Sequence, residues 1–199
     1  GEENINSYNI SKSLENSEKD FLEHFSSAED VGRKIWGNMA EEVIEKLNGS
    51  EEFGQYSARE KILAYYFTFF EVAVEHRSFI EKTACKTSLM RSYRDNFKEF
   101  IGDIVQEGVA MDEIVERLSL SNYYPEMLWA LHLRLLHYWL NDASEHFVDT
   151  ERAIEIYTKV PLQLMGHNLF DSVFETAKFQ LESLKPEKLN FEAFNPFRS

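Results

Sequence analysis

The stretch that decides the fold is Ser57–Arg77, with the sequence SAREKILAYYFTFFEVAVEHR. Ser57 and Glu60 have the spacing of a capping box, in which each side chain accepts a hydrogen bond from a backbone N–H at the start of a helix. After the box, apolar residues recur so often that they cover much more than one face of the helix. The sequence therefore predicts a helix from Ala58 to about Arg77 that is buried on most of its sides.

Helical periodicity continues on both sides of this stretch, with apolar residues spaced three and four apart. Gly49 is expected to end the preceding helix in the left-handed conformation. Pro125 suits the first turn of a helix, since its missing N–H would be unpaired there, and Thr150 is expected to be an N-cap. The sequence contains no convincing strand pattern, so we expect an all-α fold. Further helices are predicted over residues 28–47, 87–109, 126–140, 150–165 and 169–184.

The chain has 199 residues, with 35 acidic and 21 basic side chains and a formal net charge of −14. This balance excludes a free-standing basic nucleic-acid binder and a polybasic membrane-surface protein, because both need clustered Lys and Arg. The 8 glycines and 4 prolines are too few for a turn-rich all-β fold. The single cysteine excludes an intrachain disulfide. The sequence has no run of about 18 apolar residues, so we expect a cytoplasmic protein without a membrane partner.

The first forty residues contain the most specific pattern. Two short helices, over residues 5–14 and 18–25, are predicted with a tight turn between them, which is the geometry of a helix-turn-helix. The segments NISK (9–12), FLEHF (21–25) and SAED (27–30) resemble the matching segments of the TetR/AcrR family of bacterial regulators. The resemblance covers about residues 5–37, and the helical arrangement of the remaining chain is similar to that family as well.

This resemblance implies a TetR-like helical bundle with two parts. Residues 1–37 would be a partial helix-turn-helix DNA-binding head, and residues 38–199 an all-α ligand-binding and dimerisation domain. The implied partners are a DNA operator, contacted by Ser17, Lys19 and His24, and a second copy of the chain. The family's first helix is expected to precede residue 1. Residues 1–37 hold four basic and eight acidic side chains, a balance that disfavours DNA binding by this head.

A second resemblance lies in residues 138–150, YWLNDASEHFVDT. The segment is similar to a signature of a TetR subgroup. It also resembles a ubiquinone-biosynthesis family that shares the TetR fold and binds lipid instead of DNA. Binding of a lipid or isoprenoid without DNA contact is therefore the alternative function. A local explanation stands beside it, because Asp142 and Ser144 can form an Asx-type turn that closes the preceding helix.

The sequence has no catalytic or metal-binding motif that we recognise. Its histidines form neither His-Glu-x-x-His nor Glu-x-x-His pairs. A Gly-rich phosphate loop and a Gly-x-Ser-x-Gly nucleophile motif are also missing. We therefore expect neither an enzyme nor a metal or cofactor site.

The remaining candidate is a cavity for a small apolar or lipid-like effector between helices 58–77 and 126–140. Large aromatic residues with a few polar tips typically line such sites. His132 is the candidate polar anchor, since it interrupts an otherwise apolar helix. The same side chains can equally form a closed core, so both interpretations stay open. The predicted lining residues are Tyr65, Tyr66, Phe69, Phe70, Trp129, His132, Leu133 and Leu136.

Overall fold

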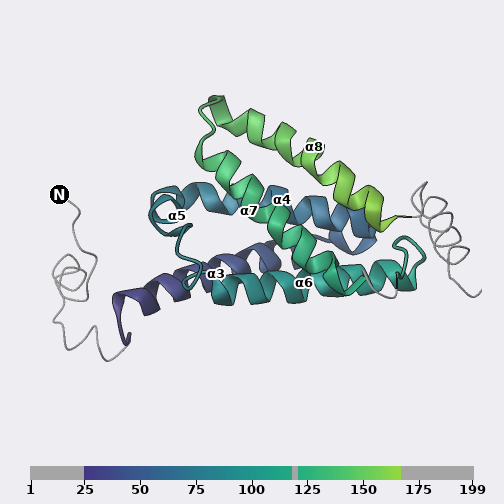
Figure 1. Cartoon of the computed structure of the whole chain (residues 1–199), viewed down its shortest axis with the longest axis horizontal. Coiled ribbons are helices and arrows are strands. Elements are labelled where there is room, and N and C mark those ends of the chain that lie inside the picture. The colour runs from purple at the N-terminus through teal and green to yellow at the C-terminus, as the bar shows by residue number, and fades with distance from the viewer. Residues whose placement is uncertain (1–24, 118–120, 167–199) are drawn as a thin grey trace, which may run out of the picture.

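The computed structural model describes residues 25–117 and 121–166, and within these ranges the chain is all-α, as predicted (Figure 1). Ser17, Lys19, His24 and the predicted helix 169–184 lie outside the described residues. Short 3-10 turns occur at Phe53–Gln55, Ser121–Tyr123 and Glu145–Phe147. The α-helices of the described ranges are α3 (Ala28–Asn48), α4 (Ala58–Glu75), α5 (Arg77–Thr83), α6 (Arg91–Ala110), α7 (Tyr124–Leu140) and α8 (Val148–Met165).

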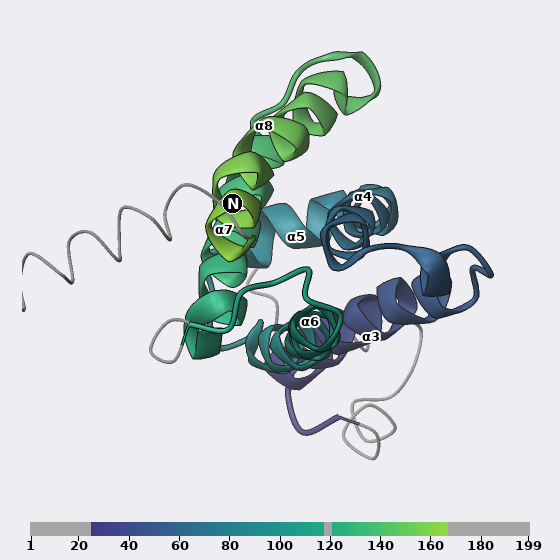
Figure 2. The ribbon, with the colours of Figure 1, turned by 90° about the vertical axis from the view of Figure 1, so that its right-hand side faces the viewer.

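Helix α4 packs against other helices on two sides. Helices α3 and α6 lie side by side, and α4 packs against both of them (Figures 1 and 2). On the other side, α7 packs on α6, and α8 packs on both α7 and α4. The core between these helices is rich in large side chains, and Trp36, Tyr65, Tyr93 and Trp139 are fully buried. No described helix has the length and apolar character needed to span a membrane.

The capping box predicted for α4 is present. The Ser57 hydroxyl accepts from the backbone N–H of Glu60 (3.3 Å), and the Glu60 carboxylate accepts from the backbone N–H of Ser57 (2.8 Å). The helix ends at Glu75, slightly before the predicted end. His76 leaves the helical region (φ −109°, ψ 12°), and α5 begins directly after it.

The left-handed cap expected at Gly49 is wrong. Gly49 has right-handed backbone angles (φ −75°, ψ −12°), and its N–H donates to the carbonyl of Glu45 (2.9 Å). The chain thus continues the turn of α3 without reversing its hand, and no positive φ is needed there. The N-terminal end agrees with the sequence pattern, because the Ser27 hydroxyl accepts from the backbone N–H of Asp30 (3.2 Å).

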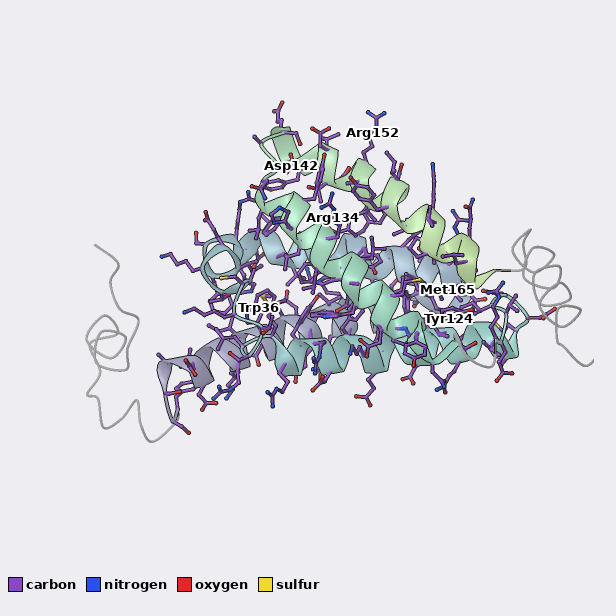
Figure 3. The ribbon with its side chains drawn as sticks, in the orientation of Figure 1. Trp36, Tyr124, Arg134, Asp142, Arg152 and Met165 are labelled. Atoms are coloured by element: carbon purple, nitrogen blue, oxygen red, sulfur yellow. The ribbon has the colours of Figure 1, made fainter. Side chains whose placement is uncertain are left out.

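The N-cap expected at Thr150 is also wrong, because α8 begins two residues earlier, at Val148. Thr150 lies in the first turn of α8, where its backbone N–H donates to the carboxylate of Asp142 (2.9 Å). The Asp142 carboxylate therefore binds one of the free amides in the first turn of α8. The sequence pattern did not show this, since the partner lies eight residues earlier, just after the end of α7 (Figure 3).

The other end of α8 is tied to the segment before α7. The backbone N–H of Val115 donates to the carbonyl of Met165 (2.8 Å). The guanidinium of Arg117 donates to the Tyr124 hydroxyl (3.0 Å) and to the carbonyl of Leu164. In Figure 3, Tyr124 and Met165 lie together at the end of α7 and α8 that is remote from Asp142. Both ends of α8 are therefore fixed to α7 or its flanking turns.

Two glycines of α6 give a matched test of how tightly α6 packs on α4. A Cβ at position 108 would lie 2.7 Å from the Cβ of Ala58 and 2.8 Å from the Cδ1 of Ile114, whereas a Cβ at Gly102 would meet nothing within 4 Å. We expect Gly108→Ala to lower the free energy of unfolding by about 1–3 kcal/mol through overpacking. Gly102→Ala should raise it by up to about 1 kcal/mol, because alanine favours the helix. Urea unfolding followed by circular dichroism measures both, and equal stability of the two variants would contradict this packing.

Candidate functional site

The centre of the molecule is an aromatic cluster around His132 of α7. The His132 side chain is fully buried. Its ring centroid lies 4.5 Å from that of Phe69, 5.2 Å from Phe97 and 5.4 Å from Tyr93. We call this group the His132 cluster and include Tyr65 in it, because its ring packs edge-on against Tyr66 and Phe97. The rings around His132 come from α4, α6 and α7, and they belong to Tyr66, Phe69, Phe70, Tyr93, Phe97 and Trp129.

The polar atoms of this cluster are incompletely paired. The Tyr93 hydroxyl and His132 Nε2 form a hydrogen bond of 2.8 Å. His132 Nδ1 and the Tyr65 hydroxyl are buried without a hydrogen-bond partner among the described residues. Burial raises the pKa of Tyr65, and the nearby Tyr93 hydroxyl offsets part of this rise, although the two hydroxyls do not reach hydrogen-bond geometry. Buried polar atoms normally have partners, so two free ones in one cluster require an explanation.

Burial also determines the protonation state of His132. Desolvation lowers the pKa of His132 to about 3, so the imidazole is neutral at physiological pH. A neutral imidazole has one donor nitrogen and one acceptor nitrogen. One of these bonds Tyr93, and the other is available for a polar atom of a bound molecule. At physiological pH the His132 ring thus offers one further hydrogen-bonding nitrogen and no charge.

The structure brings the predicted lining residues together and packs them closely. Six of them are buried, while Trp129 and Leu133 are half-buried and pack against the same core. The Tyr66 hydroxyl donates to the carbonyl of Leu128 (2.8 Å). Phe70 also lines a cavity of about 320 Å³ between α4 and α8, and the other seven predicted residues are not part of that cavity's wall. The predicted residues therefore belong to one packed core, and a ligand site among them stays a prediction.

The sequence pattern missed two members of the cluster and the role of a third residue. Tyr93 and Phe97 were not among the predicted lining residues, yet they supply two of the rings around His132. Their i, i+4 spacing was the available signal, because it places two aromatic rings on one face of α6. Trp139, at the end of α7, is fully buried and lines the α4–α8 side of the molecule.

Arg77 and Asp142 fix the turn between α7 and α8. The Arg77 guanidinium lies 4.5 Å from the Trp139 ring centroid and 4.8 Å from that of Phe147. It also donates to the carbonyls of Trp139 and Leu140, both at 3.1 Å. Arg77 therefore satisfies carbonyls at the end of α7, where the helix has no further amides to offer them.

Asp142 completes this turn from the other side. Its carboxylate accepts from the backbone N–H and hydroxyl of Ser144 (2.8 and 2.6 Å), which confirms the predicted Asx-type turn. It also accepts from the backbone N–H and hydroxyl of Thr150 (2.9 and 2.5 Å). Partial burial acts to raise the pKa of Asp142, but the hydrogen bonds from Ser144 and Thr150 outweigh it and lower the pKa to about 2. The carboxylate is thus ionised at the N-terminus of α8, where a negative charge is favourable.

The described residues contain no group of three His, Cys, Asp or Glu side chains placed to hold a metal ion. Neutral His132, surrounded by rings, has no carboxylate or thiol within its cluster that would activate it.

The buried neutral state of His132 leads to a prediction about how the free energy of unfolding depends on pH. The unfolded chain protonates His132 near pH 6.5, but the folded protein does not until about pH 3. The stability that the protein gains from keeping His132 neutral is fully present above about pH 6.5. As the pH falls below this value, the free energy of unfolding decreases by up to about 1.4 kcal/mol per pH unit. We expect His132→Gln, which keeps an acceptor for Tyr93, to show a flatter loss of stability between pH 6.5 and 4 than the unmodified protein.

The control for this experiment is His146→Gln, since the His146 side chain is 88% exposed. Chemical denaturation at a series of pH values gives the free energy of unfolding for all three proteins. Parallel pH curves for the unmodified protein and His132→Gln would show that His132 is not held neutral by burial.

Comparison with known proteins agrees with this architecture. A family model described as a tetracyclin repressor-like C-terminal domain matches residues 61–180, which is more than half of the chain. The match begins within α4 and includes α5, α6, α7 and α8. No curated protein matches the chain. The chain therefore belongs to the tetracyclin repressor-like family, through a C-terminal domain that contains the whole of the His132 cluster.

Proposed function

We propose that this protein is a TetR-type transcriptional regulator whose residues 38–199 bind a small apolar effector and dimerise. In this proposal residues 1–37 are the DNA-binding head, with Ser17, Lys19 and His24 in contact with an operator. The observation that carries the effector proposal is the His132 cluster, in which buried polar atoms lack partners inside an aromatic environment. Family membership supports the assignment to a regulator.

The unpaired atoms provide a driving force for an effector to bind within the packed core. A buried polar atom without a partner costs about 1–3 kcal/mol. An apolar molecule with one or two polar groups would recover this cost at His132 Nδ1 and the Tyr65 hydroxyl. Because the surrounding rings come from α4, α6 and α7, inserting a molecule there would move these helices apart. Such a movement favours one conformation over another, which is how an effector changes DNA affinity.

Dimerisation is proposed through α8. Its outer surface carries Ile156 and Val160, one helical turn apart and 47 and 61% exposed, with Tyr157 (37% exposed) beside them. An apolar strip of this kind on a fixed helix is typical of a surface that pairs with another protein. Since both ends of α8 are tied to α7 and its flanking turns, the strip is presented rigidly. A second copy of this chain is the partner we propose.

A second candidate function is binding of a lipid or isoprenoid without DNA contact. The acidic balance of residues 1–37, with four basic and eight acidic side chains, favours it. The same His132 cluster would then serve as the lipid site. The two candidates share the ligand domain and differ in whether the head binds DNA.

DNA binding separates the two candidates. We expect the full chain to bind duplex DNA from the region upstream of its own gene, with an affinity that falls as salt is raised. Lys19→Glu should weaken this binding and lower the salt dependence, because one phosphate contact is lost. Arg59→Glu, an equal charge change at an exposed position of α4, is the control. Fluorescence anisotropy at low and moderate salt measures the affinity, and a lack of salt-dependent binding at both would favour the lipid-binding candidate.

Adjacent tyrosines of α4 test the effector site. Tyr66→Phe removes a satisfied hydrogen bond and should lower the free energy of unfolding by about 1 kcal/mol. Tyr65→Phe removes a hydroxyl without a partner and should be neutral or slightly stabilising. Tyr65→Phe should instead reduce the amount of apolar compound that co-purifies, as measured by mass spectrometry of a solvent extract. Equal destabilisation by both variants, with unchanged co-purification, would remove Tyr65 from the site.

A further inference from the structure

A cavity of about 560 Å³ lies between α3 and α6, outside the His132 cluster. This volume is within the range of small-molecule pockets. Its walls come from the end of α3, the turn Phe53–Gln55, the first turn of α4 and one face of α6. We propose that this α3–α6 cavity binds an organic cation, whose apolar ring packs on Phe53 and Phe100 and whose ammonium group lies between Glu99 and Asp103. The inference rests neither on DNA binding nor on an effector at His132.

Part of the cavity wall is apolar and aromatic. The ring centroids of Phe53 and Phe100 lie 6.2 Å apart, and the two ring planes differ by only 13°. Phe53 and Ile104 are buried, whereas Phe100 and Ile44 are half-buried and keep part of their surface accessible. Two nearly parallel rings with accessible surface offer a place where another ring can pack.

Lys61 shows how an ammonium group is held in this wall. The Lys61 side chain is only 7% exposed, and its Nζ donates to both carboxylate oxygens of Glu107 (2.7 and 2.6 Å). The same Nζ lies 5.8 Å from the ring centroid of Phe53. A carboxylate and an aromatic face together form a favourable environment for a cation. Because Lys61 and Glu107 neutralise each other, the other charged wall residues decide which ligand is attracted.

Glu99 and Asp103 provide carboxylates of the same kind without a cation. Both are exposed, both line the cavity, and they lie one helical turn apart on α6. Arg94 and Lys98, two neighbouring basic residues of α6, form their ion pairs with other carboxylates. Within the described ranges, no ion pair involves Glu99 or Asp103. Like charges at this spacing repel each other, so a cation bound between them would be stabilised by both.

The polar lining defines the chemical class of the ligand. One lysine and three carboxylates line the cavity, a balance of −2 that disfavours an anion. The side-chain amides of Asn48 and Asn96 also line it and can accept hydrogen bonds from an ammonium group. In the described part of the chain, no three His, Cys, Asp or Glu side chains are placed to hold a metal ion. An amine that carries an apolar ring therefore fits this cavity better than a bare metal ion does.

The test compares naphthylmethylamine, a cation at neutral pH, with naphthylmethanol, a neutral molecule of the same shape. We expect the unmodified full chain to bind the amine at least about threefold more tightly than the alcohol. Glu99→Gln and Asp103→Asn keep the size of each side chain but remove its charge. Each should weaken amine binding about two- to fivefold and leave binding of the alcohol nearly unchanged. Equilibrium dialysis measures the affinities, because naphthalene fluorescence reports the free ligand.

Two further variants test specificity and location. Glu81→Gln makes the same charge change at an exposed position of α5 outside the cavity, and it should leave amine binding nearly unchanged. Asn48→Trp places a large ring at an exposed wall position, and it should weaken binding of both compounds by filling the cavity. Thermal unfolding shows whether each variant is folded.

Several results would overturn the inference. The first are failure of the unmodified protein to bind the amine, and equal affinities for the amine and the alcohol. An equal loss in Glu99→Gln, Asp103→Asn and Glu81→Gln would show attraction to the overall negative charge alone, and unchanged binding in either cavity variant would remove that carboxylate from the site. Unchanged binding in Asn48→Trp would place the ligand elsewhere.

The His132 cluster is tested in the same experiment. Tyr65→Phe should leave amine binding unchanged, and a loss there without a loss in Glu99→Gln would place the amine in the His132 cluster. None of these outcomes bears on operator binding, so this inference and the proposed regulator function can fail separately.

Discussion

The burial of α4 is the constraint on which the rest of the structure depends. Its apolar side chains surround the helix so completely that no single neighbour can cover them. Helices α3, α6 and α8 cover it from different directions, and α7 supplies His132 to the resulting centre. Because the rings of several helices contact one another there, displacing one ring would displace the others. The centre of the fold is therefore also the place from which a bound molecule would move several helices.

The turn between α7 and α8 is joined to the helices on both of its sides. Arg77, at the start of α5, contacts both the end of α7 and Phe147 before α8. Asp142 then joins the turn to the first residues of α8. These two side chains connect the segment after α4 to the helix whose outer face carries the exposed apolar strip. A shift of α4 relative to α7 would thus reach the proposed dimer surface through a few well-defined contacts.

Much of the fold could be predicted from local sequence signals. The capping box at Ser57 and Pro125 both mark helix starts where the structure has them. The error at Thr150 has a clear physical cause. A cap is set by the hydrogen-bond partners that are present, and for Thr150 the partner is the carboxylate of Asp142, on the far side of a turn. Residue type alone indicated a cap at each position but not its geometry.

The sequence by itself determined the helices, the burial of α4 and the aromatic composition of the candidate site, because periodicity and capping depend on neighbours within one or two turns. The tertiary structure decided which polar atoms meet. Tyr93 bonds His132 across 39 residues of sequence, while His132 Nδ1 and the Trp139 indole are left without partners in the described part of the chain. Such pairing depends on how whole helices pack, and periodicity within one helix does not specify it.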